Sequence, residues 1–292
     1  MTMVRAGEVE LYYELRRNGD EPVLMLICGL GGQVTSWDEG FCDELTKRGF
    51  GLLLFDNRDT GLSSSFDDAG VPTIDLSPGA TAPEVPYTVV DMADDAATML
   101  ETIGLDAVHV AGISMGGMIA QQLAISHPEL VLSLCSIMSA PSAQDAGVPS
   151  EAALEALLTP PPPGRSEYLD SQVVVWKAIG SPGFPFNETR IRDKAAAAYD
   201  RSFRPAGIGR QLSAILVSPD RSAGLRNVKV PTLVIHGDSD PLISPAGGRA
   251  TAVAVPGSRL EIVPGMGHDL NPEIWSEVAD SIAENAGLEA NR

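Results

Sequence analysis

A serine at position 114 lies in the segment GISMGG, which spans residues 112–117. An apolar run precedes this segment and a helix-forming run follows it, so the pattern predicts a strand, a sharp turn and a helix with Ser114 at the turn. Small residues at Gly112 and Gly116 allow the helix to fold back against the strand without a side-chain collision. The segment therefore indicates a nucleophile elbow that raises the Ser114 hydroxyl out of a sheet.

A serine nucleophile needs a general base, and the chain contains four histidines. His268 follows a predicted strand and the turn PGMG, which places it at the carboxyl edge of a parallel sheet, where catalytic groups collect. His236 ends a strand directly before a glycine and stays a candidate. His109 lies inside the strand before the elbow, and His127 ends the helix after it, where a cation stabilises the helix dipole. We therefore expect His268 to be the base.

The base needs an acid that orients it, and the segment HGDSDP at residues 236–241 supplies two carboxylates. Asp240 precedes a proline, which biases its backbone towards an extended conformation that can aim the carboxylate at the His268 loop. Asp238 is expected to form the turn by binding local backbone amides. The sequence thus predicts a catalytic triad in the chain order Ser114, Asp240, His268.

Attack by serine also requires hydrogen-bond donors for the substrate oxygen that becomes negatively charged. The backbone amide of Met115, directly after Ser114, is expected to be one donor. We expect the second donor in the glycine-rich loop CGLGG at residues 28–32, with Leu30 as the choice and Gly31 as the alternative.

Motifs for cofactors and metals are missing from the chain. The CGLGG loop does not match GxGxxG, and no Lys-Ser or Lys-Thr pair follows it, so a nucleotide site is not expected. Neither CxxC nor HExxH occurs, so no metal site is expected. The predicted chemistry needs no cofactor.

The elements that must position these residues follow an alternating pattern. Strand-like and helix-like runs alternate through the first half, which predicts a mostly parallel, doubly wound α/β sheet. The expected strands cover residues 9–14, 23–28, 52–55, 107–111, 131–138, 232–235 and 260–263. The expected helices of this core cover residues 36–47, capped by Ser36, and 91–103, 115–126 and 274–283. A mobile surface loop is expected over residues 67–86.

The alternation stops after the strand that ends at Met138. Helical pieces at residues 151–158, 167–178, 188–199 and 209–217 follow, separated by prolines and glycines. Because strand patterns resume later, we expect an insertion into the sheet and not a separate domain. The prediction is a core of residues 1–139 and 226–292, with residues 140–225 forming a helical cap, or lid.

Composition limits the partners and the compartment. The chain has 20 Lys and Arg against 39 Asp and Glu, a formal charge of −19, which would repel nucleic acid and anionic membrane surfaces. The first residues do not resemble a secretory signal, and the longest apolar stretch is shorter than the roughly 20 residues that a bilayer requires. Cys28, Cys42 and Cys135 lie in apolar patterns, which favours a reducing cytoplasm. We expect a cytoplasmic monomer or homodimer that acts on a small molecule.

The segments GISMGG, HGDSDP and GMGH together resemble the α/β-hydrolase superfamily across nearly the whole chain. The loop DNRDTGLS at residues 56–63 resembles that superfamily's DxRGxGxS turn, with Asp59 in the glycine position. This form of the turn, together with the segments MADDAA, PTLVIHGDSDP and PGMGH, is similar to the esterase group that contains aclacinomycin methylesterase and actinobacterial lipase or esterase homologues. The chain has Cys28-Gly29 where the superfamily often has His-Gly. Because the expected donor is a backbone amide, this departure concerns the support of the loop and not the oxyanion hole itself.

The resemblance implies the α/β-hydrolase fold and hydrolysis of a carboxylic ester through an acyl-enzyme on Ser114. The same triad also serves lactonases, hydrolases of carbon–carbon bonds, proline iminopeptidases and cofactor-free perhydrolases. Outside enzymes, the fold can serve as a small-molecule receptor or an inactive scaffold. A complete set of Ser, Asp and His favours the enzyme, because the site and not the fold indicates function.

The cap is expected to set the substrate class. A small to medium, fairly hydrophobic ester is predicted from the apolar side chains that the cap and the elbow could supply. The expected pocket residues are Met118, Val174, Trp176, Phe184 and Phe186.

Overall fold

The computed structural model describes residues 2–74 and 83–288 of the chain. Within these residues, eight strands form one sheet in the order β1-β2-β4-β3-β5-β6-β7-β8. Neighbouring strands from β4 to β8 are parallel, whereas β2 is antiparallel to both β1 and β4. The strands are β1 (Thr2–Ala6), β2 (Val9–Arg16), β3 (Val23–Ile27), β4 (Gly51–Phe55), β5 (Val108–Ile113), β6 (Val131–Ile137), β7 (Thr232–Gly237) and β8 (Arg259–Val263).

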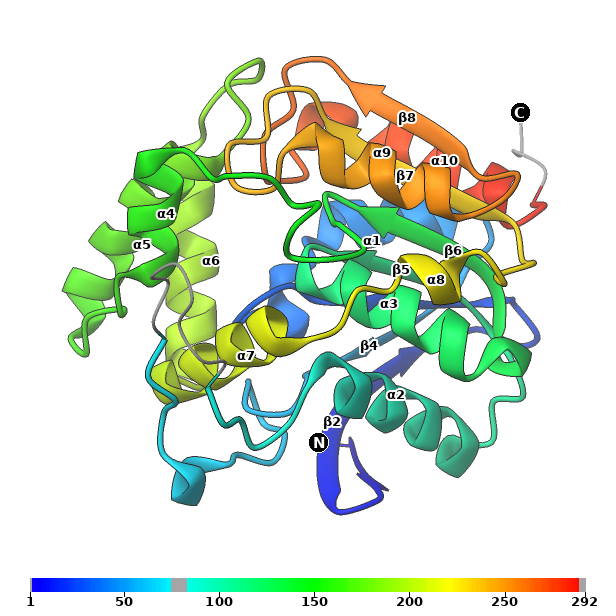
Figure 1. The fold of residues 1–292 in the computed structure, drawn as a ribbon, viewed down its shortest axis with the longest axis horizontal. Coiled ribbons are helices and arrows are strands. Elements are labelled where there is room, and N and C mark those ends of the chain that lie inside the picture. The colour runs from blue at the N-terminus through cyan, green and yellow to red at the C-terminus, as the bar shows by residue number, and fades with distance from the viewer. Residues whose placement is uncertain (1, 75–82, 289–292) are drawn as a thin grey trace.

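Helices cover both faces of the sheet, so the core has three layers (Figure 1). Strand β3 shows why: Leu24 and Leu26 join one buried apolar cluster, while Met25 and Ile27 join the other. Such a continuous apolar run is typical of a parallel strand that is buried on both faces. The first cluster includes residues of α1 (Glu39–Lys47) and α10 (Trp275–Asn285), and the second includes residues of α2 (Val89–Ile103), α3 (Met115–Ser126), α8 (Ser222–Leu225) and α9 (Pro245–Ala254).

The expected mostly parallel, doubly wound sheet is confirmed, and each expected strand and core helix is present with its ends shifted by a few residues. The sequence pattern does not predict β1 or α9. Helix α9 contains Gly247 and Gly248, which lower helix propensity. A Cβ atom at Gly248 would lie 2.6 Å from Nδ1 of His236, so close packing on β7 explains the glycine.

The start of α1 differs from the prediction that Ser36 caps it. Residues Val34–Ser36 form a 3-10 turn, in which the Gln33 amide donates to Ser36 Oγ at 3.1 Å. The α-helix begins three residues later, with Asp38 as its N-cap. Of the surface loop expected over residues 67–86, residues 75–82 lie outside the described residues; Asp67–Ala69 forms a second 3-10 turn.

Five helices lie between β6 and β7 in the chain, where the insertion is expected. The short α8 is the last of them, and the four before it are α4 (Glu151–Leu158), α5 (Arg165–Ile179), α6 (Glu188–Arg201) and α7 (Pro205–Val217). Figure 1 shows α4, α5 and α6 as a group beside one end of the sheet, with α7 running from this group towards the core. None of the helices in residues 2–74 and 83–288 has the length and apolar character that a membrane crossing requires.

Arg221 joins the two ends of this inserted segment. Its backbone amide donates to Pro141 O at 3.0 Å, and its Nη2 donates to Ala140 O at 2.9 Å. Its Nε donates to Gln121 of α3 at 3.2 Å. The start and the end of the segment between β6 and β7 therefore meet at the buried side chain of Arg221.

Helix α7 is held on the core by a buried ion pair. Arg210 donates through Nε and Nη2 to the two carboxylate oxygens of Asp59, at 2.8 Å and 2.7 Å. Asp59 has a φ of 69°, a backbone conformation that favours glycine and that Asp tolerates better than most residues. The Phe66 amide also donates to this carboxylate, at 2.8 Å. The aspartate in the position of the usual glycine is thus matched by an arginine from the inserted helices.

This ion pair predicts a large effect on stability. We expect Arg210→Met to lower the free energy of unfolding by about 3–5 kcal/mol, because it leaves the Asp59 carboxylate buried and unpaired. The double variant Asp59→Gly with Arg210→Met should recover part of the loss, since it buries no charge and places glycine at the positive φ. The recovery is incomplete because the Tyr87 hydroxyl and the Phe66 amide lose their acceptor. Urea unfolding measures both values. A single variant within about 1 kcal/mol of wild type would contradict the role of the pair.

Candidate active site

Ser114 lies in a strained turn between β5 and α3. Its φ is 55°, which is uncommon for a residue with a side chain. The turn is tight: a Cβ atom at Gly112 would collide with the carbonyl of Gly116, and one at Gly116 would collide with the carbonyl of Ile27. The Ser114 amide donates to Ile137 O at 2.9 Å, and Ser139 Oγ donates to Ser114 O at 2.8 Å. The last residue of β6 and the segment directly after it therefore hold the serine backbone on both sides.

The structure brings Ser114, His268 and Asp240 together. His268 Nε2 lies 2.9 Å from Ser114 Oγ, and His268 Nδ1 lies 2.7 Å from Asp240 Oδ2. The histidine and the aspartate are each only 6% exposed, whereas the serine is half-buried. This is the geometry that a serine, a base and an orienting acid require.

Asp240 is surrounded by donors. Its Oδ1 accepts from the amides of Leu242 and Ile243, at 2.9 Å and 3.0 Å. Burial raises its pKa, but the neighbouring His268, the hydrogen bonds from His236 and His268 and the Leu242 amide outweigh burial and hold the pKa below the usual range. The carboxylate is therefore stabilised in its charged form.

The other histidines have partners of their own. His236 is fully buried; its Nε2 donates to Ile243 O at 2.9 Å and lies 3.5 Å from Asp240 Oδ2, so it supports the loop that carries Asp240. His109 Nδ1 lies 2.8 Å from Ser133 Oγ, and burial lowers its pKa. His127 follows the last residue of α3, and its Nε2 lies 2.8 Å from a carboxylate oxygen of Asp94 in α2.

Asp238, the alternative acid, is placed in the turn. Its Oδ1 accepts from the Gly265 amide at 2.7 Å and from Ser239 Oγ at 2.7 Å. It binds the turn before His268 and makes no hydrogen bond to that imidazole within the described residues.

The His268 loop is also held by the end of α5. The His268 amide donates to Ile179 O at 2.7 Å, and the Gly267 amide donates to Ser181 Oγ at 2.9 Å. The Ser181 amide in turn donates to Asp269 Oδ1 at 2.7 Å. The end of α5 and the residues after it therefore contact the loop that carries His268.

The glycine-rich loop after β3 packs directly on the serine. A Cβ atom at Gly29 would lie 3.2 Å from Ser114 Cβ. The Gly31 amide donates to Oε1 of Gln211 in α7 at 2.9 Å, so this amide already has an acceptor. The amides of Leu30 and Met115 donate to no protein acceptor within the described residues. Of the two alternatives, Leu30 is therefore the amide that is free to bind a substrate oxygen.

The loop is supported by side chains that sequence reasoning missed. Gln211 shows no motif and lies in an amphipathic helix. Asn57 donates through Nδ2 to Cys28 O at 3.3 Å. Its only signal in the sequence is its place beside Asp56 in the DNRDTGLS turn. Gln211 and Asn57 therefore hold the backbone of the glycine-rich loop at Gly31 and at Cys28.

The structure places the five expected pocket residues in three different environments. Met118 is buried in the core cluster beneath α3. The side chains of the apolar residues 173–175 point in different directions around the axis of α5. Val173 is buried, whereas Val174 is 66% exposed. Trp176 and Phe186 line a cavity of about 140 Å³ beside Asp269.

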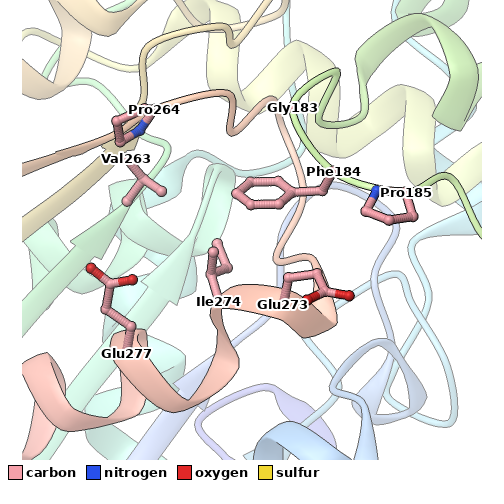
Figure 2. Close-up of a pocket in the computed structure, with 8 residues that line it drawn as sticks. All are labelled: Gly183, Phe184, Pro185, Val263, Pro264, Glu273, Ile274 and Glu277. Atoms are coloured by element: carbon pink, nitrogen blue, oxygen red, sulfur yellow. The ribbon is translucent and has the colours of Figure 1, made fainter.

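Phe184 belongs to a different hollow, of about 580 Å³. Figure 2 shows its ring pointing towards Val263 and Ile274, with Glu273 and Glu277 on the same side as Ile274. Neither this hollow nor the smaller cavity is lined by Ser114. Among residues 2–74 and 83–288, no group of three or more His, Cys, Asp or Glu side chains could hold a metal ion.

The lowered pKa of Asp240 predicts how acid affects stability. A carboxyl whose folded pKa lies below its unfolded pKa, about 3.9 for Asp, adds stability that is complete above the unfolded value and is lost as pH falls through the folded value. We expect urea unfolding to give wild type a larger free energy than Asp240→Asn at about pH 6, and the gap to narrow below about pH 4. A gap that stays constant or widens in acid would contradict the stabilised Asp240 carboxylate.

Comparison with known proteins shows the family to which the chain belongs. The model of the family described as the alpha/beta hydrolase fold matches residues 22–273. Rhodomycin D methylesterase of Streptomyces sp. (strain C5) is 29% identical over 96% of this chain and 96% of its own, and that of Streptomyces peucetius is 29% identical over the same shares. The crystal structure of the enol-lactonase from Burkholderia xenovorans LB400 is alike in fold, with a TM-score of 0.71 and 22% identity over 98% of this chain and 100% of that chain. The chain belongs to the α/β-hydrolase fold family.

Proposed function

We propose that the protein is a serine hydrolase that cleaves a carboxylic ester through an acyl-enzyme on Ser114. The observation that carries this proposal is the continuous chain of hydrogen bonds from Ser114 Oγ through His268 to Asp240. The two methylesterases that are similar over nearly the whole chain support the ester as the bond cleaved.

The first half of the reaction forms the acyl-enzyme. His268 Nδ1–H donates to Asp240, which leaves Nε2 free to accept the Ser114 proton as Oγ attacks the ester carbonyl. Asp240 stabilises the imidazolium that results. His268 then gives the proton to the leaving alcohol as the carbon–oxygen bond of the ester breaks.

The second half releases the acid. His268 takes a proton from water, which attacks the acyl carbonyl, and returns that proton to Ser114 Oγ as the acyl–oxygen bond breaks. In both halves the carbonyl oxygen becomes negative beside the amides of Leu30 and Met115. Met115 is the first residue of α3, so the positive end of the helix dipole adds to the stabilisation.

We propose residues 1–139 and 226–292 as the catalytic core and residues 140–225 as the cap, with a small to medium, fairly hydrophobic ester between them. The names of the similar enzymes favour a small leaving alcohol such as methanol.

Replacing the nucleophile tests the proposal. We expect wild type to hydrolyse p-nitrophenyl butyrate and to be labelled once by a fluorophosphonate. Ser114→Ala should do neither, because Ser114 carries the hydroxyl that is bound to His268 in the part of the chain that the structure describes. Ser133→Ala, in which the lost hydroxyl belongs to β6 and pairs with His109, serves as the control and should be labelled normally. Labelling that persists in Ser114→Ala would overturn the assignment.

The orienting acid can be tested against its neighbour. We expect Asp240→Asn to lower kcat by about 10⁴-fold, because the amide no longer selects the imidazole tautomer that accepts the serine proton. Asp238→Asn, two residues away in the same loop, should keep kcat within about threefold of wild type because Asp238 binds only the turn. Steady-state kinetics of both variants decide between them, and equal losses would contradict the assignment of Asp240.

A further inference from the structure

Gln211 of helix α7 binds the oxyanion loop with both ends of its amide group engaged. Its Oε1 accepts from the Gly31 amide at 2.9 Å, across 180 positions of sequence. Its Nε2 donates to Arg58 O at 2.8 Å. The side chain is fully buried, so both hydrogen bonds are shielded from water.

The bond to Gly31 acts on the peptide unit beside the proposed donor. The Leu30 and Gly31 amides flank the same α-carbon, so an acceptor that fixes the Gly31 amide also restricts the direction of the Leu30 amide. Gly31 has a φ of 66°, and a Cβ atom there would lie 3.0 Å from the side chain of Ile208. Helix α7 therefore both packs against the loop and binds its backbone.

Helix α7 is itself fixed next to this contact. Arg210, the preceding residue, makes the two-pronged ion pair with Asp59. A Cβ atom at Gly207 would collide with the Asp59 carbonyl, so the helix backbone lies directly on the turn of residues 56–63. Because Asn57 of the same turn donates to Cys28 O, the turn and the helix hold the loop from two sides.

We propose that Gln211 is a positioning residue for the oxyanion hole, through which a helix of the inserted segment becomes part of the catalytic apparatus. This inference rests on the proposed function, because it concerns the donor that stabilises the transition state. Gln211 does the work of the histidine that is missing before the loop. Its action is indirect: it touches the loop and not the substrate.

The test is the isosteric variant Gln211→Met, assayed with p-nitrophenyl butyrate. We expect kcat per active site to fall about ten- to hundredfold and KM to change by less than about threefold, because a misplaced donor weakens transition-state binding more than ground-state binding. Titration with a fluorophosphonate counts the active sites, so loss of folded protein does not enter kcat. Inhibition by butylboronic acid, whose tetrahedral adduct places an oxygen in the hole, should weaken by a similar factor.

The matched control is Ser213→Ala in the same helix. Ser213 is fully buried, and its hydroxyl donates to Gly209 O within α7 at 2.9 Å, away from the loop. We expect this variant to keep the kcat, KM and boronic acid affinity of wild type. A kcat per active site of Gln211→Met within twofold of wild type, or a rise in KM with kcat unchanged, would overturn the proposal.

A second variant carries the test if Gln211→Met does not fold. Gln211→Glu keeps the shape of the side chain and, when its carboxyl is protonated, both hydrogen bonds. We expect its kcat per active site, relative to wild type, to fall as pH rises and the introduced carboxyl ionises beside Arg58 O. A ratio that does not change with pH would overturn the proposal.

The two proposals fail in different ways. If wild type hydrolyses no ester and is not labelled by the fluorophosphonate, the proposed function and this inference fail together. If wild type is active and labelled, and Gln211→Met matches it in kcat and in boronic acid affinity, only the inference about Gln211 fails.

Discussion

The close approach of α3 to β3 and β5 is the constraint on which the site depends. Without side chains at Gly112 and Gly116, the helix begins against the strand ends, and Ser114 is held at a positive φ between them. The hydroxyl therefore projects from the carboxyl edge of the sheet, where the loops after β3 and β8 also arrive. Hydrogen bonds that join Ser114 to the last residue of β6 and to Ser139 maintain the backbone strain at this one residue, and in the proposed mechanism this strain aims the nucleophile.

The helices between β6 and β7 also fix loops at this edge of the sheet. The end of α5 binds the amide of His268, α7 binds the loop of Leu30 through Gln211, and the Asp59–Arg210 pair joins α7 to the core. Each contact is a buried hydrogen bond or a buried ion pair, which gives it a defined geometry. Two of the loops that carry out the proposed chemistry are thus fixed by the segment that would also shape the substrate site.

Local sequence patterns predicted the sheet, the elbow and the three residues that meet at its edge. Ser114, Asp240 and His268 each lie in a short turn after a strand, so the local motifs and their order along the chain were sufficient to choose these three residues. Gln211 could not be found in this way, because its partner Gly31 is 180 positions away and a single glutamine in an amphipathic helix carries no pattern. The departure at Asp59 was visible in the sequence, but the arginine that compensates for it was not.

The pocket was the least predictable part. In the run of residues 173–175 every side chain is apolar, so periodicity could not show that Val174 faces solvent and Val173 faces inward.

The proposed reaction requires a covalent intermediate on Ser114. Rapid quenching of wild type with p-nitrophenyl butyrate, followed by peptide mass spectrometry, should find one butyryl group on the peptide that contains Ser114. A burst of turnover with no butyryl group on Ser114, or with the group on another residue, would contradict it.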